Sequence, residues 1–79
     1  MDIMEIKEKV RKFMGRFFRN QEIADDTDIF EKGFANSLFS MQLVMFVEKE
    51  FDLVIENEDL DLENFKSINA ISELIKSKM

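Results

Sequence analysis

The sequence predicts an all-α fold, a small four-helix bundle made of three main helices and one short helix. Apolar residues recur at steps of three and four in three separate segments, which is the periodicity of a helix with one buried face. Residues that favour helix starts precede these segments, and the chain contains no proline that would break them. A chain of 79 residues is expected to form a single domain, residues 1–79, around one thin core.

The first predicted helix spans residues 3–18. Its apolar residues follow steps of three, four, three, one and three: Ile3, Ile6, Val10, Phe13, Met14 and Phe17. Asp2 can cap the start of this helix, and Glu5 stands three residues later as its partner in a capping box. Gly15 costs about 1 kcal/mol relative to alanine, so we expect the last turn to be weak.

A long connection follows, residues 19–36, rich in Asp, Asn, Gln and Gly. Four apolar residues punctuate it: Ile23, Ile29, Phe30 and Phe34. Apolar residues at this spacing predict a segment laid across the bundle and not a disordered linker. Loops of this length in a compact domain are often functional.

The second predicted helix, residues 37–51, has more apolar residues than its burial requires. One stripe suffices to bury it: Ser40, Leu43, Val47 and Phe51, with Val44 beside them. A second stripe holds Leu38, Met41 and Met45, and a third holds Phe39, Gln42, Phe46 and Lys49. A surface helix normally has one apolar sector of about 100° or somewhat more. Either the long connection covers the surplus, or the surplus is an exposed docking face with adaptable Met side chains.

The remaining chain predicts one short helix and one longer one. Residues 52–66 hold apolar residues among dense acids, and we expect a short helix near 57–63. Ser67 then caps a last helix whose buried face is Ile68, Ile71, Leu74 and Ile75. Lys76 and Lys78 stand at its end, where cations suit the helix dipole.

The composition argues against an enzyme. The chain has neither cysteine nor histidine, which excludes disulfides, thiolate metal sites and every Ser–His triad. The acidic stretches "DDTDIFEKGF" and "EDLDLENF" resemble calcium-binding loops in composition, but their residues do not follow the spacing of an EF-hand loop. Counted from Asp26, the sixth residue is Glu31 where glycine is needed, and the twelfth is Ser37 where glutamate is needed. We therefore expect no metal site.

The net charge is −6, and it is unevenly distributed. Residues 1–20 hold six Lys/Arg against three Asp/Glu, whereas residues 21–79 hold five against fourteen. Such an acidic surface suits basic partners and repels nucleic acid, although it also serves plain solubility. The chain shows no signal peptide and no stretch long enough to cross a membrane. We expect a soluble cytoplasmic protein that binds neither nucleic acid nor membrane.

Ser37 stands at the front of the second predicted helix, and two interpretations of it are open. A serine before a helix is usually an N-cap. However, Asn36 could cap equally well, which would leave the Ser37 hydroxyl on the first turn. A phosphate ester at that position would meet free backbone N–H groups and the positive end of the helix dipole. The site could hold a phosphodiester, although no residue of this chain could attach one.

The stretch "DIFEKGFANSLFSMQLVMFVEKEFDLVI" resembles the attachment motif of acyl and peptidyl carrier proteins. That motif reads D-x-F-x-x-G-x-x-[DN]-S-[LM], followed by a helix that ends in E-x-x-F. The matching positions are Asp28, Phe30, Gly33, Ser37, Leu38, Leu43, Glu48 and Phe51. The tail "ENFKSINAISELI" is similar to the family's closing helix, so the resemblance covers nearly the whole chain.

The resemblance implies a role for Ser37, which maps onto the serine that receives a 4′-phosphopantetheine arm from coenzyme A. A separate Mg²⁺-dependent phosphopantetheinyl transferase attaches the arm, whose thiol holds acyl groups as thioesters; the cofactor brings the sulfur that the chain lacks. Asn36 and Leu38 flank the attachment site. The implied partner-binding residues of the second helix are Leu38, Phe39, Met41, Met45 and Glu48. Further implied partners are an acyl- or aminoacyl-loading enzyme, tailoring enzymes and an acyltransferase or synthase.

Departures from the family pattern bear on the pathway. Asn36 stands where acyl carriers most often have Asp, and Phe39, Gln42 and Lys49 occupy positions that are often acidic in fatty-acid carriers. The apolar second helix resembles free-standing carriers of polyketide and hybrid peptide–polyketide pathways, including those that build unusual malonyl-type extender units. A fatty-acid or D-alanyl carrier is the alternative within the family. A helical adaptor without a prosthetic group is the alternative outside it.

Overall fold

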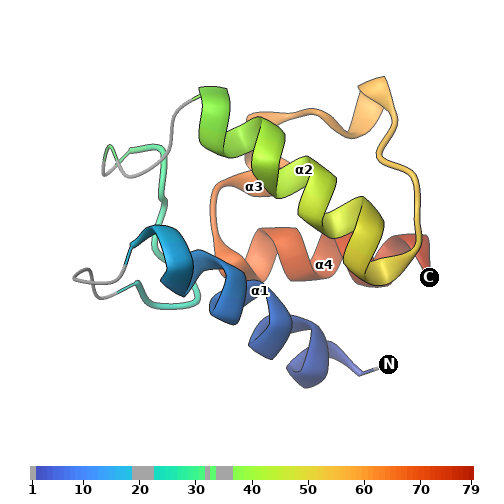
Figure 1. Ribbon diagram of the computed structural model, residues 1–79, viewed down its shortest axis with the longest axis horizontal. Helices are drawn as coiled ribbons and strands as arrows, with labels where there is room; N and C mark the ends of the chain where they lie inside the picture. The colour runs from blue at the N-terminus through green and yellow to red at the C-terminus, as the bar shows by residue number, and fades with distance from the viewer. Residues whose placement is uncertain (1, 19–22, 32, 34–36) are drawn as a thin grey trace.

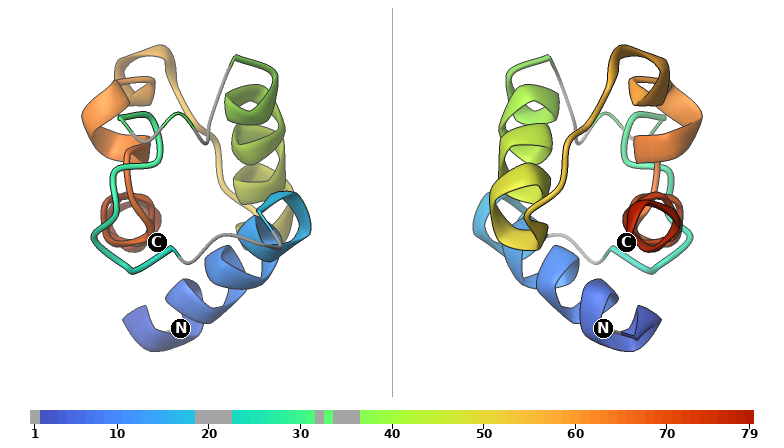
Figure 2. Two further views of the ribbon diagram at one scale, coloured as in Figure 1. Left: turned by 90° about the vertical axis from the view of Figure 1, so that its left-hand side faces the viewer. Right: turned by 90° about the vertical axis from the view of Figure 1, so that its right-hand side faces the viewer.

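The computed structural model describes residues 2–18, 23–31, 33 and 37–79. These residues form helices and no strand, which confirms the predicted all-α class (Figure 1). The elements are α1 (Ile3–Phe17), α2 (Ser37–Phe51), the 3₁₀ helix η1 (Asn57–Asp59), α3 (Leu62–Phe65) and α4 (Ile68–Lys78). In both views of Figure 2, α1 lies beneath α2, and the η1–α3 segment lies across the bundle from α2.

Two predicted helix starts are confirmed by hydrogen bonds. The Asp2 carboxylate accepts the backbone N–H of Glu5 at 2.9 Å, and the Ser67 hydroxyl accepts that of Ala70 at 3.1 Å. Each cap satisfies one of the N–H groups that a first helical turn leaves without a partner. At the other end of α1, the helix continues through Gly15 to Phe17, so the glycine does not end it.

The short helix predicted near 57–63 is wrong in its placement. The structure has a 3₁₀ turn, η1, and a separate α3 that begins at Leu62. The division follows from Asp61, whose carboxylate accepts the N–H of Glu63 at 3.0 Å and thereby starts a new helix. Helix α3 then places Phe65 in the core, with 6% of its surface exposed.

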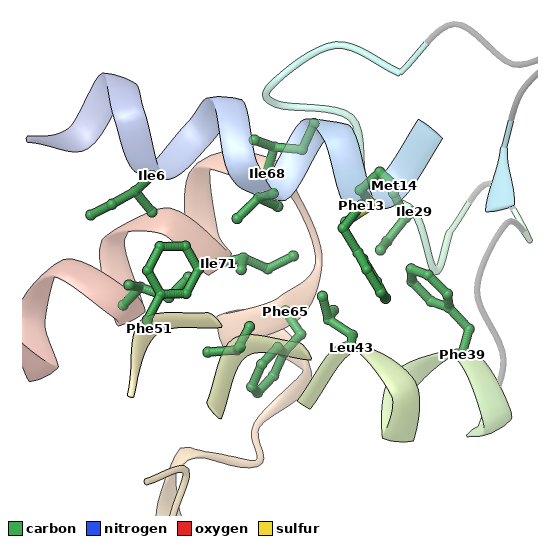
Figure 3. Close-up of a cluster of buried hydrophobic side chains, with 13 residues drawn as sticks. Ile6, Phe13, Met14, Ile29, Phe39, Leu43, Phe51, Phe65, Ile68 and Ile71 are labelled. Atoms are coloured by element: carbon green, nitrogen blue, oxygen red, sulfur yellow. The ribbon is translucent and has the colours of Figure 1, made fainter. Parts of the chain in front are cut away.

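The core lies where α1, α2 and α4 face one another, with α3 and the long connection closing its sides (Figure 3). Of the predicted stripe of α2, Leu43, Val47 and Phe51 are buried in this core, whereas Ser40 and the adjacent Val44 are half-buried. The other buried apolar residues are Ile6, Val10, Phe13, Met14, Ile29, Phe39, Phe65, Ile68, Ile71 and Ile75. Their side chains remove apolar surface from water, which is the main stabilising contribution in a domain of this size.

The described part of the connection between α1 and α2 is laid across the bundle, as predicted. Ile29 is fully buried, and its N–H donates to the Lys66 carbonyl at 2.8 Å. The N–H of Asn69 donates to the Asp25 carbonyl at 2.9 Å, which fixes the connection to the start of α4. Phe34 lies outside the described residues. Over the ranges that the structure describes, no helix is both long and apolar enough to cross a membrane.

Candidate functional site: the start and outer face of α2

Helix α2 begins at Ser37, which places that residue in the first helical turn. The backbone N–H groups of a first turn have no partner within the helix, and the helix dipole puts its positive end there. A phosphodiester on a first-turn residue is therefore electrostatically favoured. Asn36, predicted as the alternative cap and as a flanking residue of the site, lies outside the described residues.

Two other residues of the motif shape the chain that leads to α2. One oxygen of the Asp28 carboxylate accepts the N–H groups of Phe30 and Glu31, each at 3.0 Å, and so closes a turn. Gly33 has a φ of 77°, in the left-handed region where a Cβ is unfavourable. The motif positions Asp28 and Gly33 thus shape the backbone that leads to α2.

The second stripe of α2 is exposed to solvent. Leu38, Met41 and Met45 have exposed fractions of 65%, 65% and 67%, although apolar side chains of this size are usually buried. In the part of the connection that the structure describes, no segment covers them. Of the two readings left open by the sequence, the exposed apolar face is therefore the one that the structure supports.

Phe39 was predicted to contact partners, and the structure corrects this. Its exposed fraction is only 5%. Its ring packs against Phe17 and Phe18 at centroid distances of 5.2 and 5.0 Å. It also lies 6.0 Å from the ring of Phe13 (Figure 3). A residue one position after Leu38 is rotated by about 100° around the helix, which turns Phe39 toward α1. Phe39 belongs to the core.

Glu48 has a structural role that the sequence did not reveal. Its Oε2 accepts the backbone N–H of Ile55 at 2.8 Å, and its carbonyl accepts the N–H of Leu53 at 3.3 Å. Together these bonds hold the chain as it leaves α2 through Asp52, whose φ is 52°. The role of Glu48 in partner binding stays a prediction.

A small hollow of about 150 Å³ lies between α2 and α3. Its walls are mainly apolar: Phe30, Ser40, Val44, Leu60, Asp61, Leu62 and Phe65. Ser40 is one helical turn beyond Ser37, so the hollow opens close to the start of α2. The first turn of α2 is electrostatically suited to a phosphodiester, and an apolar hollow lies one turn further along the helix.

Comparisons with known proteins agree with this geometry. Residues 5–75 match the family described as "Phosphopantetheine attachment site". The D-alanyl carrier protein of Streptococcus mutans is 26% identical over 72 residues, covering 89% of this chain and 90% of the relative. The D-alanyl carrier protein of Streptococcus uberis is 27% identical over 75 residues, covering 92% of this chain and 94% of the relative.

Two solved structures share the fold. The crystal structure of Bradyrhizobium japonicum glycine:[carrier protein] ligase complexed with glycylated carrier protein contains a chain that matches with a TM-score of 0.78 and 20% identity, covering 89% of this chain and 97% of that one. The crystal structure of the same ligase complexed with cognate carrier protein and an analogue of glycyl adenylate contains a chain that matches with a TM-score of 0.82 and 19% identity. The match covers 94% of this chain and 99% of that one.

Proteins of the matched family are carriers and not enzymes, and their attachment site takes covalent 4′-phosphopantetheine. The match spans most of the chain, and the fold agrees with it. The chain therefore belongs to the phosphopantetheine-attachment family of acyl and peptidyl carrier proteins, which hold acyl or aminoacyl groups on that arm.

Proposed function

We propose that Ser37 bears the 4′-phosphopantetheine arm and that the cargo is a small aminoacyl group delivered by an adenylating ligase. The observation that carries the cargo assignment is the relationship to D-alanyl carrier proteins, which extends over about nine-tenths of both chains. The attachment assignment is supported by the motif around Ser37 and by its position in the first turn of α2.

The chain's own residues then have binding and presenting roles. The start of α2 stabilises the negative charge of a phosphodiester on Ser37. The exposed stripe of Leu38, Met41 and Met45 gives partner enzymes an apolar surface that adapts to differently shaped hollows. When bound, the arm supplies a thiol on which the cargo is held as a thioester. A transferase attaches the arm, and loading and consuming enzymes supply all catalysis.

Of the alternatives within the family, the relationship to D-alanyl carrier proteins favours an aminoacyl carrier over a fatty-acid carrier.

The pathway is a second, finer proposal. The apolar stripe of α2, with Lys49 and Gln42 beside it, differs from the acidic helix that fatty-acid enzymes grip with basic patches. This favours polyketide or hybrid peptide–polyketide biosynthesis, with a malonyl-type extender unit as the alternative cargo. Tailoring enzymes and an acyltransferase or synthase would then be the partners that act after loading.

A loading assay tests the proposal. The protein bearing its arm is incubated with a panel of adenylating ligases, each with its amino acid and ATP, and in parallel with malonyl transferases and malonyl-coenzyme A. Intact mass spectrometry reads the cargo. We expect an aminoacyl thioester that Ser37→Ala does not form. Loading by malonyl transferases alone would reject the aminoacyl cargo in favour of the extender unit, and cargo on Ser37→Ala would reject the attachment site.

A further inference from the structure

Three cations border the exposed face of α2 on the side of α1. Lys12 and Arg16 belong to α1, and Lys49 belongs to the last turn of α2. We call these three residues the basic flank. All three are exposed, and within the described ranges none forms an ion pair with another residue. By contrast, Lys9 one turn earlier is already neutralised by Glu50 at 3.0 Å.

The basic flank is continuous with the apolar stripe through Phe46. One depression is lined by Lys9, Lys12, Phe13, Arg16, Phe46 and Glu50. A second is lined by Met45, Phe46, Glu48 and Lys49. Phe46 forms part of both walls, and its ring stacks on Phe13 at a centroid distance of 4.3 Å, which fixes it between α1 and α2. Cations and exposed Met45 therefore share one surface.

The opposite border of α2 has the opposite charge. There the η1–α3 segment presents exposed acids, Glu56, Glu58, Asp61 and Glu63, and Asp61 shares a hollow with Ser40 and Val44 of α2. Figure 2 shows α1 and this segment on different sides of α2. The net charge of the chain is −6. Three exposed cations that form no ion pair with any residue the structure describes therefore reverse the local electrostatic potential beside the apolar stripe.

We propose that the basic flank and Met45 form a docking surface for a partner protein that presents carboxylates around an apolar hollow. Complementary charge would steer the partner to this side of α2, while the acidic border repels it from the other side, so the charges fix its orientation. The exposed methionine suits an apolar protein hollow. Nucleic acid and anionic membranes are disfavoured because the chain as a whole is acidic.

This inference extends the proposed function, since docking serves the loading or removal of cargo, but its test does not need the arm. All binding experiments use the Ser37→Ala protein, which cannot bear the arm at that residue. The probes are two synthetic helical peptides of equal length with the same Leu and Phe apolar face. One has a polar face of Glu and the other of Lys. Binding is measured by calorimetry, and the contact surface is mapped from backbone amide shifts in ¹⁵N-labelled protein.

We expect the Glu peptide to bind at low ionic strength and to shift amides around Lys12, Arg16, Met45 and Lys49. Added salt should weaken it, because exposed charges are screened. Reversing the flank with Lys12→Glu, Arg16→Glu and Lys49→Glu together should weaken binding about fivefold or more. Lys76→Glu reverses an exposed cation in the last turn of α4, outside the basic flank, and should leave binding unchanged.

Three outcomes would overturn the docking proposal. In the first, the Lys peptide binds the same surface as tightly as the Glu peptide. In the second, the Glu peptide does not bind, or its binding is unchanged when the three cations of the basic flank are reversed. Vesicles of phosphatidylglycerol could bind in a manner that requires the same three cations, which would make the flank a membrane contact. Because Ser37 is already substituted, none of these results bears on the attachment site.

Discussion

The ammonium of Lys78 lies 2.7 Å from the Asp59 carboxylate and joins the last turn of α4 to η1. The two side chains are only 21% and 16% exposed, so this pair is shielded more than a typical surface ion pair. The hydrogen bond from Lys78, together with that from the Glu56 N–H, lowers the pKa of Asp59 below its ordinary value. The Asp59 carboxylate in turn raises the pKa of Lys78.

The Asp59–Lys78 pair should stabilise the fold in a pH-dependent way. Because the pKa of Asp59 is lowered on folding, its contribution is present above the unfolded-state pKa and is lost as the pH falls through the folded-state pKa. Asp59→Asn should therefore reduce the free energy of unfolding at neutral pH, and the difference from wild type should shrink below about pH 4. Urea unfolding over a pH series measures this.

The other ion pair of the same length supplies the control. The Lys66 Nζ and the Glu63 Oε2 are also 2.7 Å apart, but the Glu63 side chain is 74% exposed. Solvent-exposed ion pairs contribute little to folding stability. Glu63→Gln should change the free energy of unfolding less than Asp59→Asn does. Equal effects, or a difference that persists unchanged into acid, would contradict the role given to Lys78. At alkaline pH the contribution of Lys78 should be lost as the pH rises through its raised pKa.

Phe39 and Met41 test which face of α2 is core. Phe39 is 5% exposed and Met41 65%. Phe39→Ala should lower the free energy of unfolding by about 3–5 kcal/mol, whereas Met41→Ala should stay within about 0.5 kcal/mol of wild type. Chemical denaturation of both variants measures this. If Phe39→Ala left the free energy of unfolding nearly unchanged, Phe39 would belong to the docking face and not to the core.

Met45 should matter for partners and not for folding. Its side chain is 67% exposed, so Met45→Glu should leave the helical circular dichroism and the unfolding midpoint close to those of wild type. The same change places a charge in the apolar contact and should slow loading by a partner enzyme about tenfold or more. Loss of helical signal in Met45→Glu would show that Met45 supports the core.

Glu48 combines a structural bond with a predicted docking role, and two variants separate them. Glu48→Ala leaves the Ile55 N–H without its acceptor and should cost about 1–3 kcal/mol of folding stability. Glu48→Gln keeps an acceptor oxygen and should be nearly as stable as wild type. If the negative charge contacts partners, both variants load more slowly by a similar factor. Normal loading by Glu48→Gln would confine Glu48 to its structural role.

The periodicity of the sequence predicted much of this fold, because buried faces and helix starts are local properties. The steps in residues 3–18 and the caps Asp2 and Ser67 led directly to α1 and α4. The division between η1 and α3 was missed because two acids, Glu56 and Asp61, stand five residues apart and each caps a separate turn, η1 and α3. A stretch this dense in acids offers several candidate caps, so its helix boundaries are not fixed by pattern alone.

The sequence predicted the part of the candidate site that lies in one contiguous motif. The sequence placed Ser37 at the start of α2 and grouped Leu38, Met41 and Met45 in one stripe, but it left open whether the connection covers that stripe. The structure shows that the stripe is exposed. The burial of Phe39 does not, because it depends on the rings of α1. The acceptor role of Glu48 toward Ile55 was equally hidden, since a bond from a side chain to a distant backbone N–H leaves no pattern in the sequence.

The most direct test of the central claim is the intact mass of the purified protein after incubation with coenzyme A, Mg²⁺ and a broad-specificity phosphopantetheinyl transferase. Ser40→Ala, which removes a hydroxyl one turn further along α2, is the matched control for Ser37→Ala, and Asn36→Asp tests for a mismatch with the transferase. We predict the gain of one phosphopantetheine in wild type and in Ser40→Ala, and none in Ser37→Ala. A gain that survives Ser37→Ala, or no gain in folded wild type and in Asn36→Asp alike, would contradict the attachment at Ser37 and favour an adaptor without the arm.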